Sequence, residues 1–315
     1  MSQYVFGVDI GGTTIKFGLF QVDGKLVEKF VIGTNTSDDG RHLLPDVAKA
    51  ILKKLETHGL TLCDVKGIGV GVPSPVDDEG MALMGTNVNW KQPVPVKEAL
   101  AELLKVSIYT TNDANLAALG ELSLGAAKGK KSAILLTLGT GIGGGIVVDG
   151  KVINGFHGVG GEIGHLVAVA QGGAPCGCGK IGCLETVASA TGIVRLAKEQ
   201  FSSFKGKSLL GDLDNVRVKH VFDAAKAGDE FSLEIIDEVG HHLGLACANL
   251  AATMDPELFI IGGGVSHAGT ILLDAIVKHY QIYAIPRIKN TPFELATLGN
   301  EAGIIGGAYL AVNGD

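Results

Sequence analysis

Residues 4–25 read Tyr-Val-Phe-Gly-Val-Asp-Ile-Gly-Gly-Thr-Thr-Ile-Lys-Phe-Gly-Leu-Phe-Gln-Val-Asp-Gly-Lys. The apolar run Tyr4–Ile10 predicts a strand, the Gly-Gly-Thr-Thr sequence a turn, and Ile15–Phe20 a second strand. Asp23-Gly24 is a typical hairpin signal, so we expect a third strand from Leu26. This stretch therefore predicts a strand, a glycine turn, a strand and a hairpin in close succession.

The same pattern returns about half a chain later. Ser132–Leu138 is an apolar strand, Gly139–Gly145 a glycine turn, and Ile146–Val148 a strand that ends in the hairpin signal Asp149-Gly150. At 315 residues the chain is long enough for about two domains. We interpret the repeat as an internal duplication, with one copy at the start of each domain.

The rest of the chain alternates helical and strand patterns. Helices are expected near 43–58, 96–104, 114–124, 190–200, 219–227, 231–254 and 303–312, and strands over 67–72, 107–111, 258–261 and 293–298. The hydrophobic content is 46%, the aromatic content is only 5% and there are 47 glycines, which suits an α/β fold packed by aliphatic and small residues. Because we expect the last helix to pack on the first domain, the predicted domains are 1–112 with 301–315, and 113–300.

The two glycine turns are candidate phosphate sites. Such turns expose backbone N–H groups, and glycine leaves room for an anion. Asp9 stands just before the first turn, where a carboxylate can hold Mg²⁺ through water. The candidate nucleotide-binding residues here are Asp9, Gly11, Gly12, Thr13, Thr14, Lys16, Thr140 and Gly141. The alternative is that both turns are ordinary hairpins. Because a strand and not a helix follows Gly144, the dinucleotide fingerprint is excluded.

Three of the five cysteines fall within eight residues, at Cys176, Cys178 and Cys183, and His165 precedes them. Three thiolates and one imidazole form a closed tetrahedral set that suits a structural Zn²⁺ ion in the loop 161–185. The alternative is a group of free or disulfide-paired thiols, although disulfides are disfavoured in an unsecreted chain of this size. A metal clamp would also fix Glu162 and Glu185, which bracket the cluster and would otherwise be solvated surface residues.

Asn112-Asp113 lies at a junction between a strand and a helix. A carboxylate in this position stays ionised near the helix N-terminus and suits a base that accepts a proton from an alcohol. The alternative is that Asp113 is only a helix N-cap. His157, His241 and His242 have no supporting partners in the sequence, and we interpret them as structural or solvated residues.

Charge and hydropathy argue against two classes of partner. The formal net charge is −7, whereas nucleic-acid binders normally carry a basic face. No run of 18 apolar residues predicts a membrane span, and the N-terminus lacks a signal-peptide layout. We therefore expect a cytoplasmic protein, in a compartment that keeps thiols reduced, with neither nucleic-acid nor membrane partners.

With these motifs in place, the chain resembles the ROK family of sugar kinases and, within it, the bacterial glucokinases. The matching stretches cover the N-terminal three-fifths of the chain in the family's order. They are Asp9–Thr14, Asn112-Asp113, Leu138–Gly145, Glu162–His165 and Cys176–Glu185. Repressors of the family carry a DNA-binding segment ahead of the first strand. Only six residues precede Gly7 here, so we expect none.

The resemblance implies a two-domain, actin-like (ribonuclease-H-like) α/β sugar kinase fold with an active-site cleft between the domains. It implies Asp113 as the catalytic base and places Gly263 and Gly264, within Gly262–Val265, against the adenosine of ATP. The implied sugar contacts are Asn87, Asn112, Asp113, Glu162, His165 and Glu185. Of these residues, Asn87 is the one matched least specifically to the family, because Asn89 lies only two positions away.

The expected function is ATP-dependent phosphorylation of the 6-hydroxyl of glucose, with Mg²⁺ and a structural Zn²⁺. The alternatives are the same chemistry on another hexose, such as N-acetylmannosamine, fructose or allose, or a non-catalytic sugar sensor. We expect a homodimer or a homotetramer.

Overall fold

The computed structural model describes residues 3–211 and 213–314, which form two compact units. The first unit contains the chain up to Lys131, Gly145–Gly161, and the chain from Thr297 on; the second contains Ser132–Gly144 and Glu162–Ala296. The division differs from the expected break after Asn112. Helix α3 (Asp113–Ser123) packs against helix α9 (Ala302–Asn313), and this long-range contact keeps residues 113–131 in the first unit.

The two main sheets have matching strand orders, β3-β2-β1-β4-β7 and β10-β9-β8-β11-β12. In the first, β1 pairs antiparallel with β2 and parallel with β4, and β7 continues the parallel part. In the second, β8, β11 and β12 are parallel, and β9 and β10 form an antiparallel hairpin. The shared order confirms that the strand pattern of the first sheet is repeated in the second, although the second copy is divided between the two units after Gly144.

The strand bounds agree closely with the pattern in the sequence. The first sheet contains β1 (Tyr4–Ile10), β2 (Thr14–Gln21), β3 (Leu26–Gly33), β4 (Val65–Val72) and β7 (Ile108–Asn112). The second contains β8 (Ala133–Leu138), β9 (Ile142–Val148), β10 (Lys151–Val152), β11 (Leu258–Gly262) and β12 (Phe293–Leu295). Strands β5 (Met81–Ala82) and β6 (Val94–Pro95) form a small separate pair.

Strand β9 begins at Ile142, so residues 142–145 are strand and not the turn that we expected. One of their glycines, Gly145, serves close packing. A methyl group at Gly145 would lie 2.6 Å from Cβ of Ala118 and 2.8 Å from the carbonyl oxygen of Ala114, both in α3. The second glycine turn is therefore short and comprises only Gly139–Gly141.

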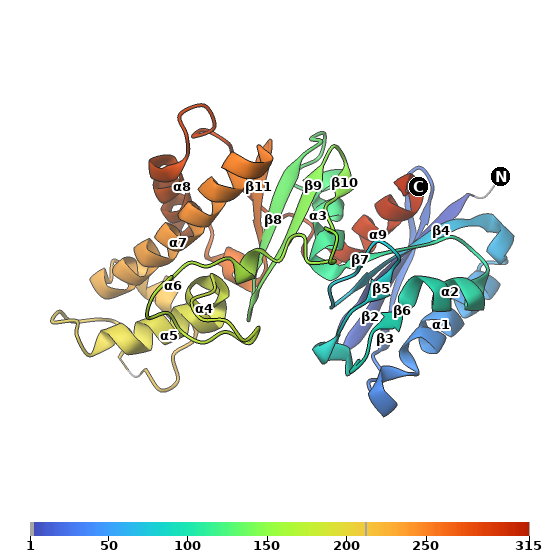
Figure 1. Cartoon of the computed structure of the whole chain (residues 1–315), viewed down its shortest axis with the longest axis horizontal. Coiled ribbons are helices and arrows are strands. Elements are labelled where there is room, and N and C mark those ends of the chain that lie inside the picture. The colour runs from blue at the N-terminus through green and yellow to red at the C-terminus, as the bar shows by residue number, and fades with distance from the viewer. Residues whose placement is uncertain (1–2, 212, 315) are drawn as a thin grey trace. The chain divides into compact units, whose positions relative to one another are not determined.

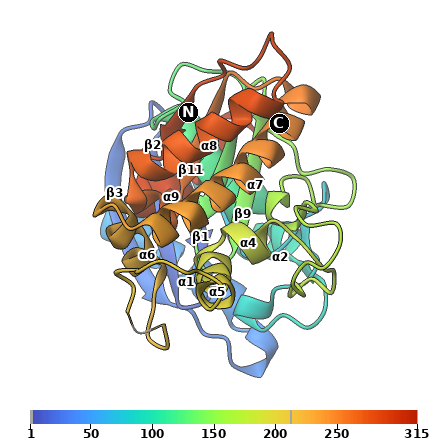
Figure 2. The same cartoon turned by 90° about the vertical axis from the view of Figure 1, so that its left-hand side faces the viewer.

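The helices whose bounds were predicted from the sequence fall close to those bounds, whereas the short helix Glu185–Ala188 was not expected. The first unit also contains α1 (Leu43–Thr57) and α2 (Val96–Leu104). The second contains α4 (Glu185–Ala188), α5 (Ala190–Phe201), α6 (Val218–Lys226), α7 (Glu230–Met254) and α8 (Thr270–Tyr283). Helices α7 and α8 lie side by side (Figure 2). Across residues 3–211 and 213–314, no helix combines the length and apolarity needed to cross a membrane.

The first sheet is covered on both faces, by α1 and α2 on one side and by α9 on the other (Figure 1). On the α9 side the sheet presents glycines. A methyl group at Gly7 would lie 1.8 Å from the carbonyl oxygen of Ile304, and one at Gly69 would lie 2.0 Å from that of Gly307. The backbones of helix and sheet therefore touch, and the expected packing of the last helix on the first domain is confirmed.

Helix α3 crosses α9 with the same closeness. A methyl group at Gly120 would lie 2.1 Å from the carbonyl oxygen of Ala302, and one at Gly306 would lie 1.7 Å from that of Leu116. Contacts this short exist only because neither glycine carries a side chain. They fix the position of α3, and hence of Asp113 at its start, relative to the sheet.

Candidate functional site

The sequence-predicted site residues divide between the two units, and each set has its own geometry. The first unit carries Asp9, Gly11, Gly12, Thr13, Thr14, Lys16, Asn87, Asn112 and Asp113. The second carries Thr140, Gly141, Glu162, His165, Cys176, Cys178, Cys183, Glu185, Gly263 and Gly264.

The first glycine turn is braced at its base and open at its tip. Gly11 N–H donates to the carbonyl oxygen of Thr14 at 3.0 Å. The Thr34 hydroxyl donates to the carbonyl oxygen of Gly11 at 2.6 Å, and Thr34 N–H donates to that of Thr13 at 3.0 Å. Gly12 and Thr13 remain exposed. A turn of this kind offers its tip to a ligand without losing its shape.

Asp9 forms an ion pair with Lys16 across the β1–β2 pair, with 3.5 Å between Oδ2 and Nζ. Its carboxylate packs on α9, where a methyl group at Gly303 would lie 2.7 Å from Cγ of Asp9. Burial raises the pKa of Asp9 above its usual value, and the Lys16 ammonium opposes that rise. A bound divalent cation would, like the Lys16 ammonium, stabilise the ionised form of Asp9.

Asn87 lies against this turn. A methyl group at Gly12 would be 2.8 Å from the carbonyl oxygen of Asn87 and 3.3 Å from its Cβ. Asn87 is exposed and belongs to the short 3₁₀ helix Thr86–Val88. The glycine at position 12 therefore has a steric role besides any role towards phosphate, because it makes room for the loop that carries Asn87.

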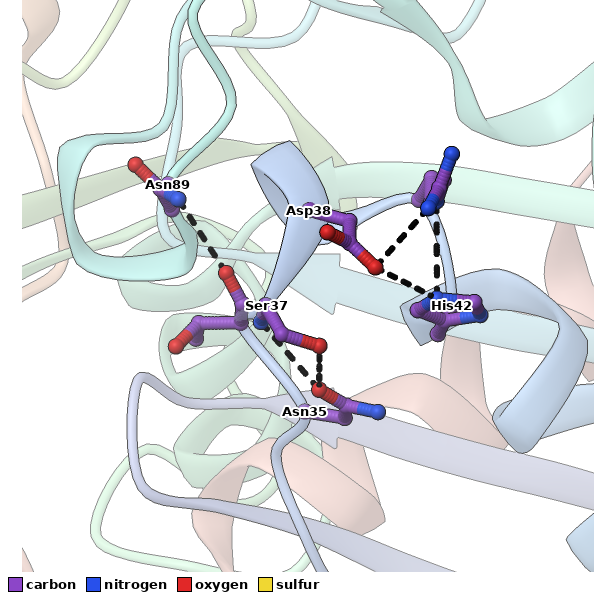
Figure 3. A network of polar contacts seen from close by, with 7 residues as sticks. Asn35, Ser37, Asp38, His42 and Asn89 are labelled. Carbon is purple, nitrogen blue, oxygen red and sulfur yellow. Dashed lines mark hydrogen bonds and ion pairs between the residues drawn. The ribbon is translucent and has the colours of Figure 1, made fainter.

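Asn89, the near neighbour, has a different role (Figure 3). Its backbone adopts a left-handed φ of 60°, and its side-chain amide donates to the carbonyl oxygen of Thr36 at 3.1 Å. The segment that it contacts is itself tied together, since Asp38 Oδ2 accepts from Arg41 at 2.9 Å and lies 3.2 Å from His42 Nε2. Asn89 thus anchors the loop 34–42, which leaves Asn87 as the better candidate for a ligand contact.

Asn112, and not Asp113, caps helix α3. Asn112 Oδ1 accepts from the N–H of Ala114 at 2.8 Å and of Asn115 at 3.4 Å, and its amide donates to the carbonyl oxygen of Ser74 at 3.3 Å. Asp113 is the first helical residue, and its Oδ1 accepts from Ala114 N–H at 2.8 Å. The alternative in which Asp113 serves as the N-cap is therefore wrong.

Three polar residues behind the start of α3 were missed from the sequence. Asn154 Oδ1 accepts from the Thr111 hydroxyl at 2.8 Å and from the Asn115 amide at 3.3 Å. The carbonyl oxygen of Asn154 also accepts from Gly160 N–H at 2.6 Å. This group joins the end of β7, helix α3 and the loop that leads to Glu162. Asn115 is part of the Asn-Asp-Ala-Asn stretch, whereas Asn154 shows no comparable signal in the sequence.

The second glycine turn is held by the start of α5. Gly139 N–H donates to the carbonyl oxygen of Gly141 at 2.9 Å, and Ala190 N–H donates to that of Gly139 at 2.8 Å. The Thr191 hydroxyl donates to the carbonyl oxygen of Thr140 at 2.9 Å. Three carbonyls of the turn are thus occupied, and Gly139 N–H is engaged within the turn, whereas Thr140 itself is exposed.

Glu185 lies directly against this turn. Its Oε2 accepts from Ile142 N–H at 2.9 Å, and a methyl group at Gly141 would lie only 2.1 Å from the same oxygen. From the sequence we expected glycine here to admit phosphate. The structure adds a second reason, because any side chain at position 141 would displace the Glu185 carboxylate.

The cysteine and histidine residues come together as predicted. The four ligand atoms of His165, Cys176, Cys178 and Cys183 lie within 4.8 Å of one another. The Sγ atoms of Cys178 and Cys183 are 3.6 Å apart, and Cys176 Sγ is 3.6 Å from His165 Nδ1. A zinc tetrahedron with Zn–S bonds of about 2.3 Å has edges of about 3.7 Å, so the donor set fits Zn²⁺. A disulfide would need about 2.05 Å between the sulfurs.

The same cluster touches both candidate carboxylates. His165 Nε2 lies 3.8 Å from Glu162 Oε2, and Cys176 Sγ lies 3.8 Å from Glu185 Oε1. A histidine that directs one ring nitrogen to a metal and the other to a carboxylate is a common arrangement around zinc. Burial raises the pKa of the Cys183 thiol to about 12 in the absence of a cation. Glu162 and Glu185 are half-buried and not the fully solvated pair of the alternative interpretation.

Backbone hydrogen bonds also hold the loop. Ala168 and Val169 both donate to the carbonyl oxygen of Gly182, at 2.8 and 3.0 Å, and Leu184 N–H donates to that of Leu166 at 2.8 Å. A methyl group at Gly182, where φ is +73°, would lie 1.8 Å from the carbonyl oxygen of Val169. The loop therefore has a framework of its own, and a metal would reinforce it.

The third glycine stretch follows β11. Gly263 has a left-handed φ of 80°, and a methyl group on it would lie 2.5 Å from the carbonyl oxygen of Leu138. Gly264 faces open space and begins the 3₁₀ helix Gly264–Ala268. A cavity of about 250 Å³ lies between this short helix and α6. It is lined by Val218, Lys219, Phe222, Asp223, Lys226, Gly264, Val265, His267 and Ala268.

A sequence profile described as the ROK family matches residues 5–313 of this chain. The chain belongs to the ROK family. A glucokinase of Halalkalibacterium halodurans is 46% identical over 98% of this chain and 94% of its own length. A glucokinase of Thermotoga maritima is 37% identical over 97% of this chain and 96% of its own length.

Among solved structures of the family, a ROK glucokinase of Streptomyces griseus in complex with glucose and AMPPNP superposes with a TM-score of 0.74. It is 34% identical and covers 99% of this chain and 100% of its own. The predicted two-domain actin-like fold class is thereby confirmed. The expected cleft and the roles of the individual site residues stay predictions.

We expect Cys178→Ser to lower the zinc content of the purified protein from about one ion per chain to a small fraction, because three donors hold zinc less firmly than four. Amide hydrogen exchange should speed up in residues 166–184, because the metal would no longer reinforce the backbone bonds of this loop. The exchange of β8 and β11 should change little, since these strands are buried and bonded to each other. Cys63→Ser, at an exposed cysteine of the first unit, is the matched control and should leave zinc content and exchange unchanged. Purified wild-type protein that contains no zinc would contradict this assignment.

Proposed function

We propose that this protein is an ATP-dependent glucokinase that transfers the γ-phosphoryl group of ATP to the 6-hydroxyl of glucose. Full-length identity of 46% and 37% to glucokinases supports the reaction and its sugar. The structural relative with glucose and AMPPNP bound supports the pair of substrates. The observation within this chain that carries the proposal is the start of α3, where Asn112 caps the helix and Asp113 is the next residue.

In this proposal Asp113 is the general base. Because Asn112 satisfies the first N–H groups of α3, the Asp113 carboxylate is not needed as the cap. The positive end of the helix dipole stabilises the ionised form of a carboxylate in the first turn. An ionised Asp113 can accept the hydroxyl proton as the sugar oxygen attacks the γ-phosphorus.

The two glycine turns would bind the phosphates through their N–H groups and stabilise the charge of the transferring phosphoryl group. Thr13, Thr14 and Thr140 add hydroxyls, and Lys16 adds a positive charge. Asp9 would hold Mg²⁺ through water, and the ion would offset phosphate charge when bound with ATP. The ion pair between Asp9 and Lys16 already places one cation beside that carboxylate.

The adenosine would occupy the cavity between α6 and the helix that begins at Gly264. Its wall combines apolar side chains, Phe222 and Val265 among them, with the open backbone of Gly264. An apolar wall beside exposed peptide groups suits a flat heteroaromatic base. Gly263 packs closely against the backbone of Leu138. This contact connects the wall of the cavity to the end of β8, after which the second glycine turn begins.

The sugar would be bound by hydrogen-bonding side chains from both units, namely Asn87, Asn112 and Asp113 from the first and Glu162, His165 and Glu185 from the second. A structural Zn²⁺ on His165 and the three cysteines would hold the last three in place, since the cluster lies 3.8 Å from each glutamate. Zinc would not take part in the chemistry, because four protein ligands leave no open position.

A panel of hexoses assayed with ATP and Mg²⁺ tests the function. We expect glucose to have the highest kcat/KM, above N-acetylmannosamine, fructose and allose. A higher kcat/KM for another hexose would identify that hexose as the substrate in place of glucose, with the same phosphoryl-transfer reaction. Absence of turnover with every sugar, while glucose binding persists, would favour the sugar sensor. The homo-oligomeric state, the cytoplasmic location and the lack of nucleic-acid partners stay predictions.

Asp113→Asn should keep the fold and glucose affinity, because asparagine preserves the shape of the side chain. The variant should lower kcat by about 10²–10⁴, the usual value of general base catalysis. Asp46→Asn is the matched control, since Asp46 stands in the first turn of α1 in the same unit. The control should alter stability slightly and kcat not at all. Near-normal turnover of Asp113→Asn would show that Asp113 is not the general base.

Gly141→Ala should impair glucose binding as well as ATP binding. The added methyl group would meet Glu185 Oε2 and break its bond with Ile142 N–H. We expect the glucose KM to rise roughly tenfold or more, in the range seen when residues that support a site are changed. Gly139→Ala is the control in the same turn, because its methyl group would find only the Gly141 carbonyl oxygen at 3.9 Å. An equal glucose KM in the two variants would show that Glu185 does not contact the sugar.

A further inference from the structure

Glu121, near the end of α3, is a buried carboxylate with an unusual set of partners. Its residue exposure is 1%. Oε1 accepts from the N–H of Thr297 at 3.0 Å and of Leu298 at 2.9 Å. Oε2 accepts from Ala126 N–H at 2.8 Å and from the Thr297 hydroxyl at 3.2 Å. In the described part of the chain no basic side chain forms an ion pair with it.

The carboxylate is therefore stabilised by backbone and hydroxyl donors alone. Burying a charge is costly unless hydrogen bonds compensate for it, and bonds to an ionised acceptor are stronger than neutral ones. Gly125 makes room for the arrangement, because a methyl group there would lie 2.0 Å from Oε2. Four hydrogen-bond donors from three residues hold this one buried carboxylate. An apolar side chain could fill the same space but could not make these bonds, so we look for a function in the bonds themselves.

The identity of the donors indicates that function. The chain passes between the two units after Lys131, Gly144, Gly161 and Ala296. Thr297 and Leu298 are the first two residues of the first unit after the last of these crossings. Glu121 thus binds the backbone of a crossing at the point where it joins the first unit.

The same helix carries both this contact and the candidate base. Helix α3 has eleven residues and begins at Asp113. Gly120 and Gly306 bring it into backbone contact with α9, so it behaves as one rigid piece of the first unit. Glu121 therefore connects the Ala296–Thr297 crossing to the element that positions Asp113.

We propose that Glu121 is a positioning residue for phosphoryl transfer, which fixes the pivot about which the two units move when substrates bind. The inference rests on the proposed function, because kinases of two domains close around their substrates to exclude water. Because Thr297 N–H and Leu298 N–H are bonded to Glu121, this crossing is held in place at its first-unit end. Without the carboxylate the crossing would gain freedom, and the closed arrangement would be less populated and less well aligned.

Asp229 offers a matched control within the second unit. It is also a buried carboxylate, 5% exposed, with four donors: the Ser208 hydroxyl, Leu209 N–H, and both the N–H and the hydroxyl of Ser232. Its partners include none of the crossings. Glu121→Gln and Asp229→Asn each replace one carboxylate oxygen by an NH₂ group that faces donors. Both should lower Tm by a few degrees for the same reason.

The experiment compares wild type, Glu121→Gln and Asp229→Asn by steady-state kinetics and by small-angle X-ray scattering with and without glucose and a non-hydrolysable ATP analogue. We expect Glu121→Gln alone to lower kcat roughly tenfold or more, since misplacement of reacting groups has effects of this size. It should also hydrolyse more ATP per glucose phosphorylated and lose most of the ligand-induced decrease in radius of gyration. Glu121→Asp, which keeps the charge on a shorter side chain, should recover part of the loss.

Kinetics and scattering of Glu121→Gln that match Asp229→Asn would overturn the proposal and leave Glu121 a purely structural residue. Should Glu121→Gln fail to fold, Thr297→Val removes only the hydroxyl bond to Oε2 and should shift the same readouts in the same direction, and unchanged readouts would again overturn it. A wild-type protein that compacts with substrates but phosphorylates no sugar would disprove the kinase function and with it the role of Glu121 in phosphoryl transfer. In that case the scattering of Glu121→Gln would still decide the pivot, because lost compaction supports it and unchanged compaction overturns it. A wild-type protein that does not compact would disprove the pivot.

Discussion

Close backbone contact between α9 and its neighbours is the constraint on which the first unit depends. The helix lies on glycines of β1 and β4, and it crosses α3 where Gly120 and Gly306 meet. Three features of the candidate site follow from this contact. Asp9 packs beside Gly303, Asp113 takes its place at the start of a fixed helix, and Glu121 reaches the segment that precedes α9. Side chains at these glycines would separate the layers and shift all three carboxylates together.

Much of the fold could be read from local signals. Apolar runs, glycine turns and Asp-Gly pairs act within a few residues, and they gave both copies of the strand pattern that the matching sheet orders confirm. The division between the units could not be read in this way. It depends on contact between α3 and α9, which lie far apart in the sequence, and no local signal reports such a contact. For the same reason the start of β9 was predicted too late in the chain, because its glycines resemble a turn, and the packing of α3 on Gly145 is visible only in the structure.

The candidate site shows a similar limit. The spacing of His165 and the three cysteines was enough to expect that they would meet, because a metal set is defined by residue types. The contact of Glu185 with the second glycine turn joins Ile142 to a residue 43 positions away, and sequence spacing gave no hint of it. It changes how the site is understood, since one carboxylate touches a candidate phosphate turn and a candidate metal ligand at once. A substitution in either motif would therefore affect the other.

The route of the chain also bears on how the protein acquires its structure during synthesis. Most of the second unit is one continuous stretch, Glu162–Ala296, whereas the first unit needs the last helix to cover one face of its sheet. During synthesis on the ribosome, the first sheet is translated long before α9. Until α9 emerges, one face of that sheet stays exposed, including the apolar side chains of Val5 and Phe20. The half that is translated first is thus the half that finishes folding last, and chaperones would find their target at the N-terminal sheet of the nascent chain.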